Sequence, residues 1–411
     1  MNASATPSTA AAKKRIGYLL HLFPRVTDTF IRREIRSLQR AGTFVHVMSV
    51  WKPSDTTPDI LADWARDTEF LLPRSPLSIV AIFLASILRS PIRLLQTACL
   101  AYSTARPGVR GFIYQVFYFV EAVLAADACR KNSIDHVHNH IGDHSGTVTM
   151  LAAKLAGIEY SITFHGWPVF FDAKNAHIKE KVRGAKFTRA ISYFCRSQLM
   201  MFSECDDPAL FKVVHCGLEI DKYDFRLPRE QVERLFCAAR LSSEKGLSFL
   251  IQALKSLNDR GYNLELRLAG DGPSRRELER LAKELGIADR VRFLGYMTEA
   301  AVNKELKAAD LFVLPSFVEG VPVSAMEAMA IGVPVIATNI AGTSELVEDG
   351  KTGLLVRPSD ANALAEAIIA MKNDYAFRRR GAELGRKKII DEFDIEKECE
   401  KLNGYFLQDH N

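Results

Sequence analysis

The chain has 411 residues, of which 48% are hydrophobic and 25% are charged, so it is long enough for two or three domains with packed cores. These values exclude a disordered tail or a small scaffold held together by disulfides. The 54 Lys and Arg residues against 49 Asp and Glu residues give a net charge of +5, too small for a dedicated nucleic-acid-binding protein of this size. The seven cysteines are odd in number and lack C-x-x-C spacing, which favours a reducing, cytoplasmic setting.

The first half of the chain alternates apolar runs with helical periods. Residues 1–12 are rich in Ala, Ser and Thr without the apolar core of a secretory signal, so we expect a short disordered lead. A helix over 27–40, with Thr27 or Asp28 as N-cap and Gly42 at its end, should lie between strands at 15–21 and 44–50. Further strands are expected at 134–138, 158–164, 187–192 and 211–215, with a helix at 143–156. This pattern predicts an α/β domain with a parallel sheet over residues 13–216.

An apolar segment interrupts this domain. Between residues 70 and 120 the charged residues are all arginines: Arg74, Arg89, Arg93, Arg106 and Arg110. The longest apolar run, 77–88, has about twelve residues, whereas a membrane-spanning helix needs about twenty. We therefore expect a helical insertion over about 75–130, which either rests on an anionic bilayer or forms a buried helix pair with arginines at its rim.

The second half repeats the alternation after an irregular linker at 217–228. Strands are expected at 235–239, 263–269, 291–294, 311–315 and 333–338, between helices at 246–260, 274–285, 298–308 and 323–330. These elements predict a second α/β domain over 229–390, followed by a C-terminal helix over 391–411 that crosses back to the first domain. Residues 1–216 carry a net charge of +9 and the remainder −4. Any ligand should bind in the cleft where the carboxyl ends of both sheets face each other.

The segment from Pro315 to Ala330 combines a strand end, a Gly and Pro loop and a helix start. Backbone N–H groups of Gly320, Val321 and Val323 should be unpaired there and favour a phosphate. The carboxylates of Glu319 and Glu327, eight residues apart, can accept hydrogen bonds from sugar hydroxyls. Arg240 and Lys245 lie on another turn after a strand, where they can neutralise a diphosphate.

Together these segments resemble glycosyltransferase family 4, retaining enzymes with the GT-B fold of two facing Rossmann-like domains. Glu319 and Glu327 are similar to its E-x7-E signature. Arg240 and Lys245 are similar to its G-R-x-x-x-x-K-G pattern, with Ala239 in place of the first Gly. The resemblance implies that His165, after a strand of the first domain, contacts the donor sugar. It further implies that nucleotide and donor contacts come from Gly270, Gly272, Gly295, Tyr296, Gly320, Val321 and Glu327.

Residues 18–35 resemble the exopolysaccharide and colanic-acid type of this family, with Phe23 and Pro24 where many members have a Gly-Gly loop. The resemblance implies transfer of a hexosyl group from a nucleoside-diphosphate sugar to a glycan or polyprenyl-linked oligosaccharide, in exopolysaccharide or cell-surface polysaccharide biosynthesis. It implies no cofactor, no metal and no nucleic acid, in a cytoplasmic protein that contacts the cytoplasmic face of the inner membrane peripherally. Acceptor-side candidates are Phe23, Arg25, His138 and His140.

Other functions remain open at this point. His136, His138, His140 and His144 lie on or just after one expected strand, and alternate residues of a strand share a face, so a zinc site is one interpretation. Glu319 and Glu327 also suit a glycoside hydrolase that uses two carboxyl groups. A GT-B nucleotide-sugar epimerase or glycan phosphorylase, or a non-catalytic membrane-associated protein, completes the alternatives.

Overall fold

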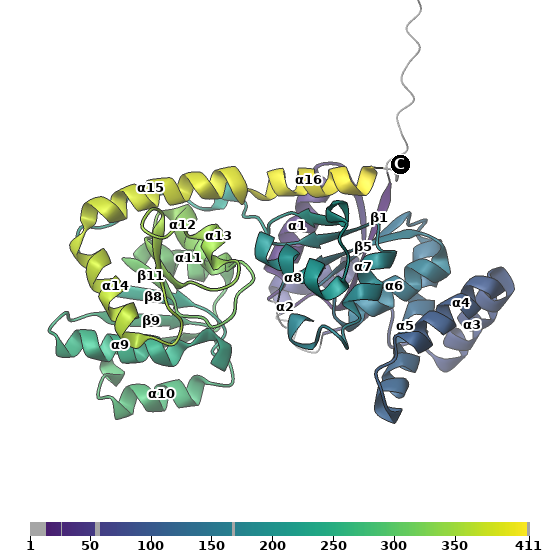
Figure 1. Cartoon of the computed structure of the whole chain (residues 1–411), viewed down its shortest axis with the longest axis horizontal. Coiled ribbons are helices and arrows are strands. Elements are labelled where there is room, and N and C mark those ends of the chain that lie inside the picture. The colour runs from purple at the N-terminus through teal and green to yellow at the C-terminus, as the bar shows by residue number, and fades with distance from the viewer. Residues whose placement is uncertain (1–13, 26, 54–57, 167–168, 409–411) are drawn as a thin grey trace, which may run out of the picture.

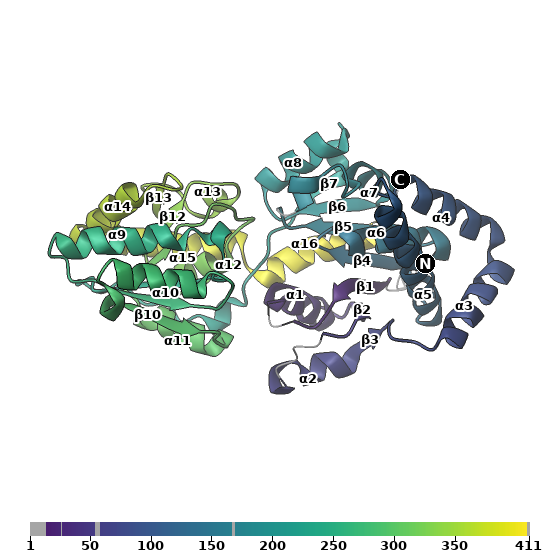
Figure 2. The ribbon, with the colours of Figure 1, turned by 90° about the horizontal axis from the view of Figure 1, so that it is seen from below.

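The computed structural model describes residues 14–25, 27–53, 58–166 and 169–408. The predicted disordered lead, 1–12, lies outside the described residues. The chain forms two α/β domains side by side, each built on a wholly parallel sheet covered by helices (Figures 1 and 2). This architecture confirms the predicted α/β class, and it follows from apolar strands that alternate with amphipathic helices.

The first sheet has seven strands in the order β3–β2–β1–β4–β5–β6–β7 within the described residues. Its strands are Arg15–Leu22 (β1), Phe44–Trp51 (β2), Thr68–Phe70 (β3), His136–His140 (β4), Glu159–Phe164 (β5), Phe187–Ala190 (β6) and Phe211–Val213 (β7). Its helices are Thr29–Arg40 (α1), Pro58–Asp67 (α2), Pro76–Arg89 (α3), Pro91–Ser103 (α4), Val109–Lys131 (α5), His144–Ala156 (α6), Ile178–Gly184 (α7) and Tyr193–Ser203 (α8). The strand order reverses between β1 and β4, which creates a crevice at their carboxyl ends.

The second sheet has six strands in the order β10–β9–β8–β11–β12–β13. Its strands are Arg234–Ala238 (β8), Glu265–Ala269 (β9), Val291–Gly295 (β10), Leu311–Leu314 (β11), Val335–Thr338 (β12) and Gly353–Val356 (β13). Its helices are Leu247–Asp259 (α9), Arg275–Glu284 (α10), Glu299–Ala308 (α11), Val323–Ile331 (α12), Thr343–Leu346 (α13), Ala361–Asn373 (α14) and Tyr375–Glu392 (α15). Here the strand order reverses between β8 and β11, so the second crevice lies where these two strands end.

The last helix, Ile395–Leu407 (α16), belongs to the first domain by its packing. Leu402 and Phe406 are fully buried in one cluster with Tyr18 and Phe187 of the first sheet. Figure 1 shows α15 on the second domain and α16 running on along the first. The chain thus passes between the domains twice, and the two passages are bonded together, since the Leu218 N–H donates to the Phe393 carbonyl at 2.8 Å. This paired crossing connects the domains near residues 218 and 394.

One local prediction differs from the structure, and one predicted segment is more buried than its turn-rich composition suggests. Asp28 does precede α1, but its carboxylate does not cap the helix. It accepts hydrogen bonds from the Arg25 backbone N–H and guanidinium instead, both at 3.0 Å. The segment expected as a linker is also not freely exposed, because Leu218 and Tyr223 are buried. Both differences arise because tertiary partners outcompete the local turn chemistry that the sequence displays.

The apolar insertion is helical as expected and consists of α3, α4 and α5. Among the described residues, α5 is the one single helix that is long and apolar enough to span a bilayer. However, 56% of its apolar 18-residue stretch is buried inside the protein. Taken together, α3 and α4 would also be long and apolar enough to span a bilayer, but they meet at a bend of 115°. The C-terminal half of α5, including Ala122 to Cys129, is a core helix of the first domain.

Glu121 of α5 is only 6% exposed, and burial raises the pKa of its carboxyl to about 7. Between about pH 4.5 and 7 the folded state therefore holds a proton that the unfolded state releases, so folding stability falls as the pH rises through this window. We expect Glu121→Gln to match the wild type at pH 5 and to be more stable by about 1–3 kcal/mol at pH 8. Urea unfolding at both pH values measures this, with Glu277→Gln on an exposed face of α10 as control. Equal differences at the two pH values would contradict the assignment.

Candidate functional site

The strongest cluster of predicted residues lies at the second crevice, where β8 and β11 end side by side. The Lys245 ammonium donates to Glu319 Oε1 at 2.7 Å, and the Ser316 hydroxyl donates to the same oxygen at 2.6 Å. Gly246 makes this approach possible, because its φ is +59° and a Cβ there would lie 2.3 Å from the Pro315 carbonyl oxygen. The structure thus brings Lys245 and Glu319 together from turns 74 residues apart in sequence.

Unpaired donors surround this ion pair. Arg240 is exposed, and its guanidinium has no bonding partner within the described residues. Within the described residues, the backbone N–H groups of Gly320, Val321 and Val323 at the start of α12 also have no hydrogen-bond acceptor. Helix N-termini carry partial positive charge and favour anions. The crevice therefore presents an arginine, a lysine and free N–H groups on one side, which suits a diphosphate.

The predicted nucleotide turns lie beside this crevice. The Gly270 N–H donates to the Gly295 carbonyl at 2.8 Å, which joins the ends of β9 and β10. Gly272 packs on the turn that carries Arg240, because a Cβ at Gly272 would meet the Leu241 carbonyl oxygen at 2.4 Å. Tyr296 follows Gly295 and is 54% exposed. Gly270 and Gly272 therefore lie against the backbone that carries Arg240, and Gly295 is bonded to Gly270.

His165 reaches the second domain through its backbone. A Cβ on Gly320 would lie only 2.5 Å from the His165 carbonyl oxygen, so the loops after β5 and β11 touch. The ring points the other way. Its Nε2 lies 3.0 Å from His140 Nδ1, and its Nδ1 lies 4.0 Å from the Cys216 sulfur. The imidazole is turned toward the first domain, so its contact with a donor sugar stays a prediction and requires the two loops to separate.

A buried charge network that the sequence analysis missed holds this ring. His140 Nε2 lies 2.9 Å from Glu34 Oε1, which also accepts from the Tyr18 hydroxyl at 2.6 Å, while Glu34 Oε2 bonds to Arg189. Burial alone would raise the pKa of the Glu34 carboxyl, but Arg189 and His140 outweigh it and hold the pKa well below its usual range. Burial, with His140 beside it, lowers the pKa of His165 well below its ordinary value, so the ring stays neutral. An arginine in the middle of the short apolar strand Phe187–Ala190 was the available signal for such a buried ion pair.

Glu327 takes part in a contact between the domains. Its Oε1 accepts hydrogen bonds from Arg33 of α1 and from the Tyr223 hydroxyl, both at 2.9 Å. Arg33 also donates to Glu299 at 2.5 Å. No described residue bonds to Glu327 Oε2, so this oxygen can still accept a hydrogen bond from a ligand. Arg33 and Tyr223 could not be predicted as partners of Glu327 from the sequence, because they lie about 100 to 300 residues from it along the chain.

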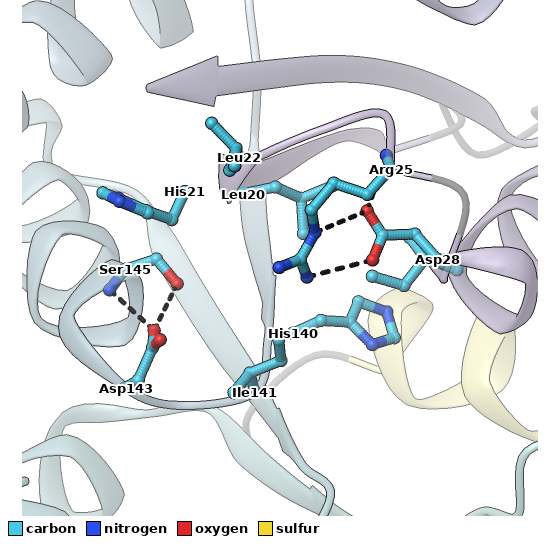
Figure 3. Close-up of a pocket in the computed structure, with 10 residues that line it drawn as sticks. Leu20, His21, Leu22, Arg25, Asp28, His140, Ile141, Asp143 and Ser145 are labelled. Atoms are coloured by element: carbon cyan, nitrogen blue, oxygen red, sulfur yellow. Dashed lines mark hydrogen bonds and ion pairs between the residues drawn. The ribbon is translucent and has the colours of Figure 1, made fainter. Parts of the chain in front are cut away.

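The first crevice, at the ends of β1 and β4, holds a pocket of about 380 Å³ counted with the solvent at its mouth (Figure 3). It is lined by Leu20, His21, Leu22, Arg25, Asp28, Ile31, His140, Ile141, Asp143 and Ser145. Arg25 points into it while paired with Asp28. Of the four acceptor-side candidates, Arg25 and His140 thus line this pocket.

The other two acceptor-side assignments are wrong. Phe23 is fully buried and packs edge-on against Trp64 with ring centroids 5.6 Å apart. His138 is also fully buried, where it bonds to the Ser161 and Thr163 hydroxyls and contacts Phe406 of α16. Neither side chain is accessible to a ligand, since α16 and α2 cover them.

The histidine strand does not supply an open set of metal ligands. Glu34, His138 and His140 place ligand atoms within 4.8 Å of one another. Each of these atoms already bonds to a protein group: Glu34 to Tyr18, His140 and Arg189, and His138 to two hydroxyls. Zinc would have to displace these partners, so the cluster is better described as a hydrogen-bond network.

Comparisons with known proteins agree with this geometry. The family model "Glycosyl transferases group 1" matches residues 219–388. The putative teichuronic acid biosynthesis glycosyltransferase TuaC of Bacillus subtilis is 30% identical over 299 residues, which cover 69% of this chain and 73% of TuaC. The putative colanic acid biosynthesis glycosyltransferase WcaL of Salmonella typhimurium is 32% identical over 46% of this chain and 48% of its own length.

The alpha-D-kanosaminyltransferase of Streptomyces kanamyceticus is 31% identical over 41% of this chain and 44% of its own length, so the chain spans about half the length of several curated relatives that it matches. Among solved structures, HepE of Anabaena in complex with UDP and glucose is 19% identical with a TM-score of 0.73, over 95% of this chain and 99% of HepE. Sucrose-phosphate synthase from Thermosynechococcus elongatus is 20% identical with a TM-score of 0.74. The fold is therefore GT-B, with two facing Rossmann-like domains, as the resemblance implied. The chain belongs to the group 1 glycosyltransferases.

Proposed function

We propose that the protein is a retaining glycosyltransferase that moves a hexosyl group from a nucleoside-diphosphate sugar to a glycan acceptor. The observation that carries this proposal is the gathering of Arg240, Lys245 and the free N–H groups of α12 where β8 and β11 end. Breaking the bond between sugar and phosphate places growing negative charge on the diphosphate. Fixed positive groups at that position stabilise the transition state more than the bound substrate.

The remaining residues of the crevice have complementary roles in this proposal. Glu319, held by Lys245, accepts a hydrogen bond from a sugar hydroxyl through Oε2, and Glu327 accepts one from the ribose. Gly270, Gly295 and Tyr296 border the base. The leaving phosphate takes the proton of the attacking hydroxyl on the same face of the sugar, which retains the anomeric configuration. No metal or cofactor takes part, because the side chains and N–H groups supply the positive charge.

Domain movement follows from the same geometry. The loops that carry His165 and Gly320 touch, so the donor enters when the domains part and is enclosed when they close again. We place the turning point of the domains at the paired crossing near Leu218 and Asp394, because both connecting segments pass there side by side and the Leu218 N–H and carbonyl bond to the backbone of Phe393 and Ile395. Closure excludes water and so suppresses hydrolysis of the donor.

For the acceptor we propose a lipid-linked glycan of an exopolysaccharide or cell-surface polysaccharide. Relatives named for colanic acid, amylovoran and teichuronic acid biosynthesis support this class of product. The pocket beside Arg25 takes the acceptor in this proposal. The protein works in the cytoplasm, in peripheral contact with the inner membrane. The epimerase or phosphorylase alternative is not favoured, since the relatives are named as transferases.

A ligand panel tests the proposed donor. The purified protein is heated with UDP, GDP, ADP, TDP and their sugars, and one nucleoside diphosphate is expected to raise Tm by several degrees. A ligand that binds the folded form alone, at about 100 times its Kd, stabilises it by about 2.7 kcal/mol. The responding sugar nucleotide is then incubated with and without a lipid-linked acceptor. Absence of any Tm response would overturn the proposal, and formation of an epimerised sugar without acceptor would assign the alternative.

A further inference from the structure

The helices α3, α4 and the first half of α5 expose large apolar side chains on one face each. On α3 these are Leu77, Val80, Leu84, Ile87 and Leu88, on α4 Ile92, Leu95 and Tyr102, and on α5 Val109, Phe112, Ile113, Val116 and Phe117. Their spacings of three, four and seven residues place them along one face of each helix, and the exposed Tyr114 widens that face on α5. Leu77 and Leu88 are 82% and 84% exposed, so nothing in the described chain covers them.

The opposite faces of these helices pack on the rest of the first domain, with Ile82 and Ala101 buried and Phe83 and Leu94 partly buried. The buried residues of α3 include Ser86, and those of α4 include Thr97. On α5, Gln115 is 5% exposed and donates to the Thr104 hydroxyl at 3.0 Å. A helix on a protein surface in water normally buries its apolar stripe and exposes its polar one. Here the outer faces are apolar as well as the inner ones, which indicates that the outer faces meet a non-aqueous environment.

The charges on this surface indicate which environment it is. Arg89, Arg93 and Arg110 are exposed on these helices, and the sequence from 70 to 120 contains no Asp, Glu or Lys. A second copy of the chain docked through the same face would bring these arginines against their own copies without an acidic partner. Anionic lipid headgroups offer the opposite charge, and an apolar stripe flanked by arginines suits the boundary between headgroups and acyl chains.

The dimensions favour one leaflet over a complete span. The 14 residues of α3 form a helix of about 21 Å, shorter than the apolar core of a bilayer at about 30 Å. The 115° bend turns α4 away from the direction of α3, and the second half of α5 is anchored in the protein core. Figures 1 and 2 show α3 and α4 at the end of the first domain farthest from the second domain. Helices α3 and α4 are thus positioned at one end of the molecule, away from the second domain.

The same helices adjoin the acceptor-side pocket. Tyr118 of α5 stacks on His144 with ring centroids 5.9 Å apart, and His144 meets His21 edge-on at 5.6 Å. His21 lines the pocket that also contains Arg25. A membrane surface at α3 to α5 therefore lies next to the pocket in which the proposed lipid-linked acceptor presents its glycan.

We propose that α3, α4 and residues 109–117 form a monotopic membrane wedge, which lies in the plane of an anionic bilayer and buries its apolar stripes in one leaflet. This inference deepens the proposed function, on which its choice of a lipid-linked acceptor rests. The wedge brings the pocket beside Arg25 to the bilayer surface, and its arginines select anionic lipid. It is defined by the exposed side chains given above.

Vesicle flotation tests the wedge with the full chain. Wild-type protein is expected to float with phosphatidylcholine vesicles that contain about 30% phosphatidylglycerol. It should bind less tightly to vesicles of pure phosphatidylcholine. Leu77→Asp together with Leu88→Asp should lower the partition coefficient by about 100-fold, because both side chains insert. The matched control, Met201→Asp with Leu384→Asp, changes two exposed apolar residues on α8 and α15 and should bind like the wild type. Arg89→Gln with Arg110→Gln should lose about 20-fold on anionic vesicles alone.

Three other outcomes would contradict the membrane wedge. The proposal is wrong if the wild type stays unbound, or if the Leu77 and Leu88 variant binds as tightly as the wild type. It is also wrong if the protein forms a dimer without lipid that this variant abolishes, since a second copy would then cover the surface. The Tm response of the variant to nucleoside diphosphate shows separately that it is folded and that the donor site works, so failure of the wedge and failure of the proposed function are distinguishable.

Discussion

Replacement of Lys245 by alanine is expected to lower kcat for glycosyl transfer by about 100- to 1000-fold, the usual effect of removing one group that stabilises developing charge. Lys245 pairs with Glu319 in the structure, and both lie beside the free N–H groups of α12. In the proposed reaction the Lys245 ammonium stabilises the negative charge of the diphosphate as its bond to the sugar breaks. The substitution should therefore lower kcat and kcat/KM together. Steady-state kinetics with saturating acceptor measure both.

The chain offers a matched control for this substitution. Lys255 on α9 is also paired with a carboxylate, that of Asp259, but it lies away from the crevice and its replacement by alanine should leave kcat within about twofold. A rise in KM for the donor without a change in kcat would refute the transition-state role of Lys245. Glu319→Gln combined with Lys245→Ala should cost less than the sum of the two single losses, because the residues act as one unit.

Replacement of Glu34 by glutamine is expected to produce the largest loss of stability among these variants, about 3–5 kcal/mol. The carboxylate is the counterion of Arg189, which is 1% exposed, and it also accepts from Tyr18 and His140. Glutamine keeps the size and some hydrogen bonds but leaves the guanidinium buried without an opposite charge. Urea unfolding at pH 7 measures the free energy of unfolding.

Tyr18→Phe is the matched comparison, because it removes one hydrogen bond to the same carboxylate and leaves the ion pair intact. It should cost about 1 kcal/mol. The low pKa of Glu34 adds a pH dependence: its contribution is present above the usual carboxyl pKa and is lost as the pH falls toward the folded value. The wild type should therefore lose its advantage over Glu34→Gln in acid. An equal difference at all pH values, or a cost no greater than that of Tyr18→Phe, would be incompatible with a buried ion pair.

Much of the fold and part of the site could be predicted from the sequence. The alternation of apolar strands and amphipathic helices has a local cause, so the two parallel sheets and most element bounds followed from it. Arg240, Lys245 and Glu319 were found because each follows a strand in a loop with Gly or Pro. Residues in such positions meet at the carboxyl edge of a parallel sheet regardless of the details of packing.

The tertiary structure alone decided which side chains are accessible and which charges are paired. Phe23 and His138 looked available in the sequence but are covered by other elements, while Glu34 meets Arg189 across 155 residues of chain. The apolar insertion was compatible with a core and with a membrane surface, and only the tertiary structure shows that Leu77 and Leu88 are exposed while the second half of α5 is buried in the core. The physical reason is the same in each case. Composition and periodicity define a residue's local conformation, but burial and ion pairing depend on segments that approach from distant parts of the chain.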